Sequence, residues 1–324
     1  MKLFRQGVIR LSVVMVISLL VTIACNNNSP ESTTSKLASS TEAYRLVKDA
    51  IATVKVPLNP QRIITLHGTA LESVLALGEK PVGTVLNGKL ETQPDFLRWQ
   101  LNDVELLGAF SEPSLEKILL LQPDLILNLD TTNIHSQLSQ IAPVVVSKYD
   151  PANSWQPSLR LYASALGKSA MAEEIIANYH QRLSDLKTQL AQEPTPITVS
   201  VIRIYPDSIT VYQSDSFSGS ILKDAGISRP PLQSQPGVQK LISQELISEA
   251  DADVIFYWAY GDDYYSKSDR LEKSLNRLTS DPLWLQLKAV KQGKVYQVPD
   301  YWIGYGVLAA NAVIDDLEKY LLKN

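Results

Sequence analysis

LEKILLLQPDLI at residues 115–126 and QELISEADADVI at residues 244–255 are degenerate copies of one segment. In each copy a glutamate, Glu116 or Glu245, is followed eight residues later by an aspartate, Asp124 or Asp253, which opens a run of aliphatic and β-branched residues. The first half of each copy has helical spacing, and the second half is typical of a buried parallel strand. Chance can produce one such pair, because helix–strand junctions are common. Two related copies nevertheless favour two α/β lobes of similar design.

Residues 1–24 predict an export signal. Lys2, Arg5 and Arg10 precede an apolar run that stops before Cys25 and is too short to span a bilayer comfortably. The chain is therefore predicted to leave the cytoplasm and to lose residues 1–24.

Cys25 is the only cysteine, and it directly follows the small residue Ala24. This junction resembles the lipobox of bacterial lipoproteins, whose cysteine is acylated, although Thr22 stands where a leucine is usual. The alternative is signal cleavage that leaves a stray thiol, which is uncommon in exported proteins. Residues 25–42 predict a lipidated, disordered tether, because their mainly polar side chains cannot bury enough apolar surface to offset the entropy of ordering.

The charge balance of the mature chain is acidic. Residues 1–24 contain three cations and no anions, so their removal leaves 27 Lys and Arg against 34 Asp and Glu, a net charge of about −7. Nucleic acids and anionic membrane surfaces both require a basic face on their partner. We therefore expect no nucleic-acid partner, and contact with a membrane only through the lipid anchor.

The remaining stretch is longer than one hydrophobic core usually supports, so it predicts an N-terminal lobe at residues 43–166 and a C-terminal lobe at residues 194–324. Strands alternate with helices, which favours mainly parallel sheets. Thr69 is expected to cap the first helix, which ends near Gly78. The predicted strands are 62–66, 81–85, 124–129 and 143–147 in the first lobe and 197–205, 253–258 and 294–298 in the second, followed by a closing helix at 308–322.

Residues 167–193 are predicted to link the two lobes. Within them, residues 169–192 contain neither Gly nor Pro. The apolar residues repeat every three or four positions, at Met171, Ile175, Tyr179, Leu183, Leu186 and Leu190. This spacing predicts one amphipathic helix about 35 Å long. It could be a beam between the lobes or a peripheral helix of the second lobe, and its position midway along the chain favours the beam.

Several short motifs, taken in order, resemble one family. They are NPQRII at 59–64, ALGEKPVG at 76–83, EPSLEKI at 112–118 with PDLI at 123–126, and PLW at 282–284 with GKVY at 293–296. Together with the exported lipoprotein head, they resemble the iron-siderophore substrate-binding lipoproteins of bacterial ABC importers. The resemblance implies an α/β fold of two Rossmann-like lobes with mainly parallel sheets, joined by a single long α-helix, with the ligand cleft between the lobes. It also implies a binding protein and not an enzyme.

The same resemblance implies the partners. The ligand would be a ferric siderophore, and the docking partner would be an ABC permease dimer that receives Glu116 from one lobe and Glu245 from the other. Exposed ion pairs give a modest affinity that suits repeated docking and release. The alternative is that each glutamate only interacts with the dipole of its own helix. The protein would be a monomer, lipid-anchored in the periplasm or at the cell surface.

Ligand contacts are expected beyond the carboxyl ends of the strands, where open α/β sheets bind their ligands. The residues at these places are His67, Arg203, Tyr205, Trp258, Tyr260, Trp302 and Tyr305. Arg203 is predicted to be the main charged contact, because a guanidinium stays charged and matches paired ligand oxygens. A hydroxamate or citrate-like chelator is favoured over a tris-catecholate, which would need more cations. Arg203 could instead lie on a polar sheet edge, Trp302 in the core, and His67 in a purely structural place.

Other functions are weighed against this interpretation. A haem ligand is possible, with His67 and Tyr205 as conceivable axial ligands, and cobalamin or another corrinoid also fits an aromatic cleft. A site for a free metal ion is disfavoured, since the chain has only three histidines, His67, His135 and His180. No resident cofactor is expected. An enzyme is also disfavoured. SFSGS at 216–220 lacks the first glycine of a nucleophile elbow, and too little chain follows GYGVLA at 304–309 to complete a dinucleotide-binding unit.

Overall fold

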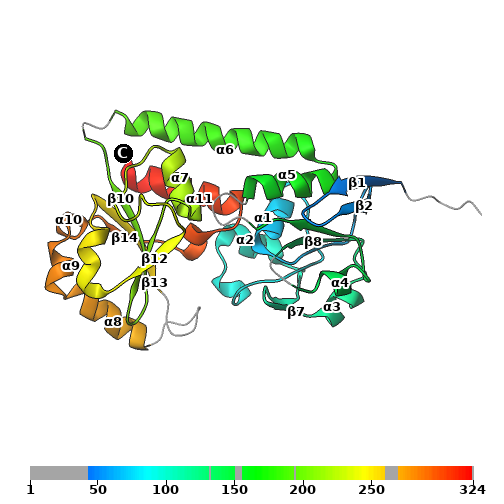
Figure 1. The fold of residues 1–324 in the computed structure, drawn as a ribbon, viewed down its shortest axis with the longest axis horizontal. Helices are drawn as coiled ribbons and strands as arrows, with labels where there is room; N and C mark the ends of the chain where they lie inside the picture. Colours follow the sequence, from blue (N-terminus) through cyan, green and yellow to red (C-terminus); the bar gives the residue numbers. More distant parts are fainter. Residues whose placement is uncertain (1–42, 131–132, 150–154, 193–194, 260–268, 323–324) are drawn as a thin grey trace, which may run out of the picture. The chain divides into compact units, whose positions relative to one another are not determined.

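The computed structural model describes residues 43–130, 133–149, 155–192, 195–259 and 269–322. Within these ranges the chain forms two five-stranded sheets, coloured blue to green and yellow-green to orange in Figure 1, and the long helix α6. The predicted signal, the tether with Cys25, and Tyr260 lie outside the described residues.

The first lobe is built on an entirely parallel sheet of strand order β5-β4-β3-β8-β9. This agrees with the mainly parallel sheet predicted from the sequence, although β5 was not predicted. Its strands are β3 (Ile63–Thr65), β4 (Gly83–Thr84), β5 (Glu105–Leu106), β8 (Leu125–Leu129) and β9 (Val144–Ser147). Its helices are α1 (Gly68–Ala76), α2 (Asp95–Arg98), α3 (Leu115–Leu120), α4 (His135–Leu138) and α5 (Trp155–Leu166), with short 3₁₀ turns η1 (Leu90–Thr92) and η2 (Trp99–Leu101). Two small hairpins, β1 (Tyr44–Lys48) with β2 (Thr53–Pro57) and β6 (Gly108–Ala109) with β7 (Glu112–Pro113), were not predicted.

The second lobe is built on a mixed sheet of order β12-β11-β10-β13-β14. The three predicted strands, β10 (Val199–Ile204), β13 (Val254–Ala259) and β14 (Val295–Gln297), are parallel. The two others, β11 (Ile209–Tyr212) and β12 (Gln239–Ile242), are antiparallel, so this sheet is less parallel than predicted. The chain reverses directly after β10, where the Tyr205 N–H donates to the Ser208 carbonyl at 2.9 Å across Pro206 and Asp207. The helical segments are α7 (Phe217–Asp224), η3 (Gln244–Ala250), α8 (Asp269–Thr279), α9 (Pro282–Gln286), α10 (Lys288–Lys291), η4 (Asp300–Ile303) and α11 (Val307–Leu321).

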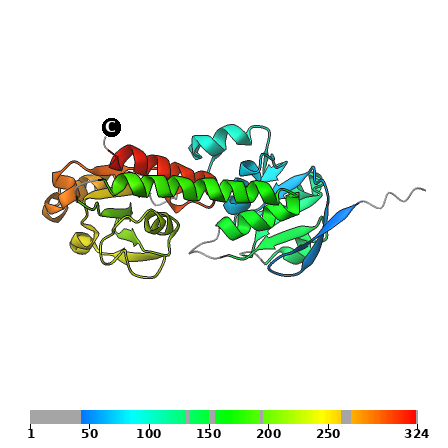
Figure 2. The same cartoon turned by 90° about the horizontal axis from the view of Figure 1, so that it is seen from above.

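Helix α6 (Ser169–Leu190) closely matches the predicted linker helix. Its buried stripe is Ala172, Ile176, Tyr179, Leu183 and Leu186, whereas the predicted Met171 is 42% exposed, because the stripe begins one residue later. Ion pairs connect the helix to its neighbours near its N-terminus and in its second half. The Arg160 guanidinium of α5 pairs with Glu173 at 2.7 Å. Arg182 pairs with Asp315 at 2.6 Å and with Glu318 at 3.0 Å on α11, which runs beside α6 in Figures 1 and 2.

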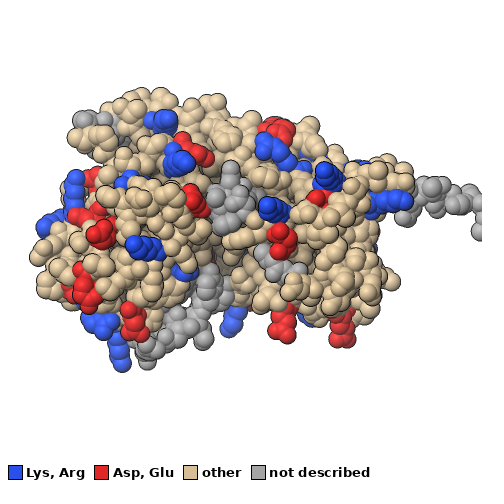
Figure 3. Space-filling view, viewed as in Figure 1, with Lys and Arg blue, Asp and Glu red and all other residues tan. Residues whose placement is uncertain are grey.

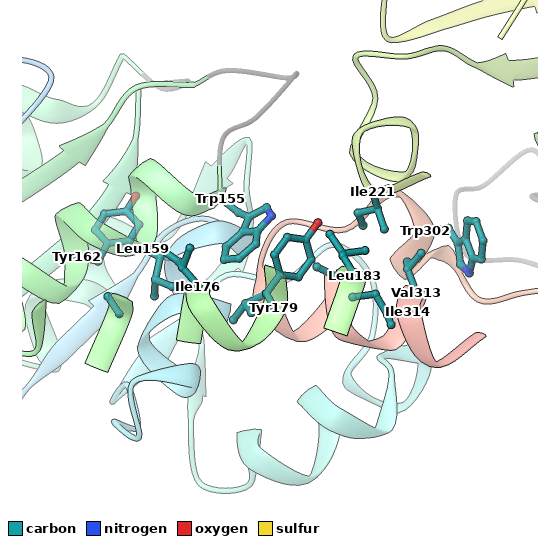
Figure 4. Close-up of a cluster of buried hydrophobic side chains, with 14 of the residues drawn as sticks. Trp155, Leu159, Tyr162, Ile176, Tyr179, Leu183, Ile221, Trp302, Val313 and Ile314 are labelled. Atoms are coloured by element: carbon teal, nitrogen blue, oxygen red, sulfur yellow. The ribbon is translucent and has the colours of Figure 1, made fainter. Parts of the chain in front are cut away.

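One continuous apolar core joins both sheets through α5, α6 and α11 (Figure 4). Trp155 of α5 meets Tyr179 of α6 edge-on, with ring centroids 5.0 Å apart. Further along the same core, Trp302 stacks on Phe256 of the second sheet at 4.5 Å. The lobes are therefore joined by packing as well as by the chain.

Candidate ligand site

A cavity of about 320 Å³ is lined by side chains from both lobes. The first lobe contributes His67 and Thr69 at the start of α1, together with Tyr149 after β9. The second contributes Arg203 and Tyr212 from β10 and β11, the N-terminal turn of α7, and residues 303–305 before α11. The cavity lies at the carboxyl ends of β3, β9 and β10, as expected for open α/β sheets.

Arg203 is the only cation among the described residues that line this cavity. The residue is 9% exposed, and its guanidinium carbon lies 4.5 Å from the centroid of the Tyr205 ring and 5.9 Å from that of Tyr212. Aromatic faces attract a cation and restrict its orientation. The guanidinium is thus held at the end of β10 by rings, where it can meet an oxygen-rich anion.

His67 is the N-cap of α1, in place of the predicted Thr69. Its Nδ1 accepts from the Thr69 backbone N–H at 3.1 Å. His67 can do so because its own backbone is extended, just after the end of β3. Burial lowers the pKa of His67 to about 4, so the ring is neutral at pH 7. Since Nδ1 is an acceptor, the proton of the neutral ring belongs on Nε2, which makes the side chain a donor.

Tyr305 lies against His67, with the ring centroids 5.2 Å apart and edge-on. It also covers Gly68, where an added Cβ would come within 2.6 Å of the tyrosine ring. The ring therefore belongs to the turn of the second lobe but rests on the first lobe. The same turn also lines a smaller, mainly apolar cavity of about 60 Å³, together with Glu72 and Tyr301.

The remaining predicted ligand contacts are less central. Tyr205 lines an adjoining cavity that shares Arg203 and Gln239 with the first one. The structure corrects the prediction that Trp258 and Trp302 contact the ligand, because these side chains are 3% and 0% exposed and belong to the core. The Trp258 ring packs against the Tyr212 ring, with centroids 5.0 Å apart, and the indole N–H of Trp302 donates to Asp316 at 2.8 Å. Neither tryptophan lines the cavity.

Sequence reasoning missed several lining residues. Tyr212 is on the unpredicted strand β11, and Ser216, Phe217 and Ser220 form the first turn of α7. The Ser216 hydroxyl caps this helix by accepting from the Gly219 N–H at 3.0 Å. The Pro206-Asp207 pair was a usable turn signal, and it would have placed β11 beside Arg203.

Glu72 of α1 is a buried carboxylate that was not among the predicted site residues. It is 2% exposed, and it accepts from the Ala309 N–H of the second lobe at 2.9 Å. Burial raises its pKa to about 7, and backbone hydrogen bonds from Ala309, Tyr305 and Leu308 oppose that rise.

The doubled segment forms a helical turn and a strand in both lobes, as predicted: α3 with β8, and η3 with β13. Glu116 and Glu245 are exposed in the first helical turn of their copies. A hydrogen bond from Ser243 lowers the pKa of Glu245. Among the described residues, neither glutamate has a cationic partner within 4.0 Å.

Two further properties concern the described part of the chain alone. It contains no cluster of three or more His, Cys, Asp or Glu side chains placed to hold a metal ion. No helix there is both long and apolar enough to cross a membrane.

Known proteins are similar to this chain in sequence and in fold. The probable siderophore-binding lipoprotein YfiY of Bacillus subtilis is 37% identical over 322 residues, which cover 96% of this chain and 97% of YfiY. The achromobactin-binding periplasmic protein of Dickeya dadantii is 34% identical and covers 80% of this chain and 86% of its own. SirA of Staphylococcus aureus, solved with staphyloferrin B, superimposes with a TM-score of 0.73 at 28% identity, over 86% of this chain and 98% of SirA.

YfiY and the Dickeya dadantii protein are described as binding proteins, and so is the matching family, which confirms the prediction of a binding protein and not an enzyme. The family model for periplasmic binding proteins matches residues 63–302, which include both sheets and the linking helix. The chain belongs to the periplasmic binding protein family.

Proposed function

We propose that this protein captures an iron(III)–siderophore complex outside the cytoplasm and delivers it to an ABC permease. The observation that carries the proposal is the cavity at the strand ends, which is lined by the neutral donor His67 and by Arg203, whose guanidinium is framed by Tyr205 and Tyr212. A ferric chelate is bulky and rich in oxygen, and it already surrounds its iron. Such a ligand needs a cation, donors and aromatic walls, and it needs no metal ligands from the protein.

We favour a hydroxamate or citrate-like chelator over a catecholate. One lining cation suits a complex of low negative charge. Relatives of 28% and 26% identity are described as binding iron(III) citrate and iron(III) hydroxamate, and one of 27% as binding ferric enterobactin. These relatives differ in ligand, so the preference rests on the charge of the cavity.

Haem fits the site less well, because of His67. To bind iron through Nε2, the neutral ring would have to carry its proton on Nδ1, and that proton would face the Thr69 N–H that now donates to Nδ1. Haem binding would therefore cost α1 its cap.

Delivery is proposed to use Glu116 and Glu245, one exposed carboxylate on each lobe in equivalent copies of one segment. A permease dimer could receive the two ends of one monomer through ion pairs. Lys and Arg are interspersed with Asp and Glu on the face seen in Figure 3, which offers no broad basic surface to a nucleic acid. Attachment to the outer side of a bacterial membrane is assigned to lipid on Cys25, where two acyl chains would give stable anchoring.

The test is a titration of the purified, ligand-free protein followed by tryptophan fluorescence. Ferric citrate and ferric desferrioxamine are the probes, and iron(III) chloride, haemin and cobalamin are the comparisons. We expect quenching by a ferric chelate and little response to iron salt alone. Tight binding of haemin with a Soret band that His67→Ala abolishes, together with no response to ferric chelates, would overturn the proposal.

A further inference from the structure

The N-terminus of α11 carries a cap that comes from the other lobe. Its N-cap residue, Gly306, has no side chain to satisfy the first backbone N–H groups of the helix. The carboxylate of Glu72, on α1 of the first lobe, accepts from the Ala309 N–H at 2.9 Å, and the backbone of Tyr305 and Leu308 nearby helps to lower its pKa. Leu308 and Ala309 are the second and third residues of the helix, the positions that an N-cap side chain normally serves.

The contact between Glu72 and α11 leaves no space for a side chain at Gly306. A Cβ on Gly306 would come within 2.6 Å of the Glu72 Cβ and 2.9 Å of its Oε2. The φ of Gly306 is −160°, which is extended backbone that any residue adopts, so the requirement for glycine is one of space. The carboxylate also lies near the positive end of the helix dipole, which favours its charged form.

The cap also controls a residue of the ligand cavity. Tyr305 directly precedes the capped N-terminus of α11, and its ring rests on His67 at 5.2 Å and lines the cavity. We propose that Glu72 is a positioning residue for ligand binding, which caps α11 across the lobe junction and thereby fixes Tyr305 against His67. This inference rests on the proposed function, because it assumes that the cavity is the ligand site.

The first experiment needs no ligand. Amide hydrogen exchange is compared in wild type, Glu72→Gln, which keeps an acceptor oxygen, and Glu72→Leu, which does not. We expect Leu308 and Ala309 to exchange about tenfold faster in Glu72→Leu, and no more than about threefold faster in Glu72→Gln, because a cap is worth about one hydrogen bond. Exchange in the last turn of α11 should stay unchanged. Equal protection of the first turn in all three proteins would overturn the inference.

The second experiment measures affinity for ferric citrate and ferric desferrioxamine. We expect Glu72→Leu to weaken binding of the responsive probe by about tenfold and Glu72→Gln by no more than about threefold. Glu174→Leu, at an exposed position of α6, is the matched control and should bind like wild type. In a Tyr305→Ala background, Glu72→Leu should add little, since residues that act through each other are not additive.

The outcomes separate the two proposals. If Tyr305→Ala weakens binding and Glu72→Leu does not, the positioning role is wrong and the ligand site stands. If no ferric chelate binds to wild type, the proposed function fails, while the exchange experiment still reports on the cap. Should Glu72→Leu not fold, Gly306→Ala serves instead, because its Cβ must displace the carboxylate. Wild-type exchange and affinity in Gly306→Ala would also overturn the inference.

Discussion

The two lobes start their central strands with the same device and then build different sheets. In the first lobe, the Asp124 carboxylate accepts from the N–H groups of Gln61 at 2.7 Å and Arg62 at 2.9 Å, just before β3. In the second, Asp253 accepts from the Thr198 N–H at 2.8 Å and hydroxyl at 2.6 Å, just before β10. The repeated aspartate thus fixes the neighbouring strand in each lobe.

The difference between the lobes begins after that strand. β3 has parallel neighbours on both sides and is followed by helix α1. By contrast, the chain turns back after β10 into the antiparallel strand β11. The turn brings Tyr212 beside Arg203 and gives the second lobe the charged wall of the cavity. The first lobe offers the neutral ring of His67. The same starting unit therefore yields a charged half-site and a neutral half-site.

The largest expected effect tests this division directly. Arg203→Ala should weaken binding of ferric citrate or ferric desferrioxamine by about 2 to 5 kcal/mol, because it removes the desolvated charge. His67→Ala removes a neutral donor and should cost about 1 kcal/mol. Fluorescence titration of both variants measures the contrast. Equal losses would mean that the lobes share the charge recognition.

The next effect concerns the junction of the lobes and depends on pH. The pKa of Glu72 is raised from 4.5 to about 7 in the folded protein, so its contribution to stability is fully present below about pH 4.5 and is lost as pH rises through 7. Relative to Glu72→Gln, which does not titrate, wild type should lose up to about 3 kcal/mol of unfolding free energy between pH 4.5 and 8. Urea unfolding at several pH values tests this. A constant difference between the two proteins would contradict the raised pKa.

A smaller effect compares the two repeated aspartates. Asp124→Asn and Asp253→Asn should each lower the unfolding free energy by about 1 to 3 kcal/mol, through lost hydrogen bonds to the neighbouring strand. Asp253 should also show acid dependence. Burial raises its pKa, but hydrogen bonds from Lys288 and Thr198 lower it overall to about 2, so its contribution is present above pH 3.8 and lost as pH falls toward 2. Lys288→Ala should reduce that acid dependence, because it removes one of the groups that lower the pKa of Asp253.

Substitution of Glu116 and Glu245 should leave the ligand affinity unchanged. Glu116→Lys and Glu245→Lys change exposed side chains outside the cavity, so titrations should match wild type while uptake of the ferric chelate by cells falls. Glu174→Lys, another exposed glutamate, is the control for a change of charge. Loss of ligand binding in correctly folded protein would move the two glutamates into the binding site. Normal uptake by both variants would remove them from docking.

The parts of the fold that the sequence predicts are those with a local signal. Strands β3, β8, β10 and β13, the helix α6 and the doubled segment all follow from apolar periodicity and chain punctuation. Among the predicted ligand contacts, His67, Arg203 and Tyr305 line one cavity in the structure.

The rest depends on tertiary contacts. A tryptophan at a strand end can face the cavity or the core, and no periodicity decides this for Trp258 or Trp302. Glu72 looks like an ordinary polar position of α1 until α11, more than 230 residues later, brings the Ala309 N–H to it. Such a contact has no signal in either segment alone.

The continuous core through α5, α6 and α11 has a consequence for how the protein unfolds. Separating the lobes would expose Trp155, Tyr179 and the apolar face of α11, all of which belong to one buried cluster. Burial of that area couples the halves, so heating should give one cooperative transition, with equal calorimetric and van't Hoff enthalpies. Neither lobe, expressed alone, would keep its side of the shared core covered.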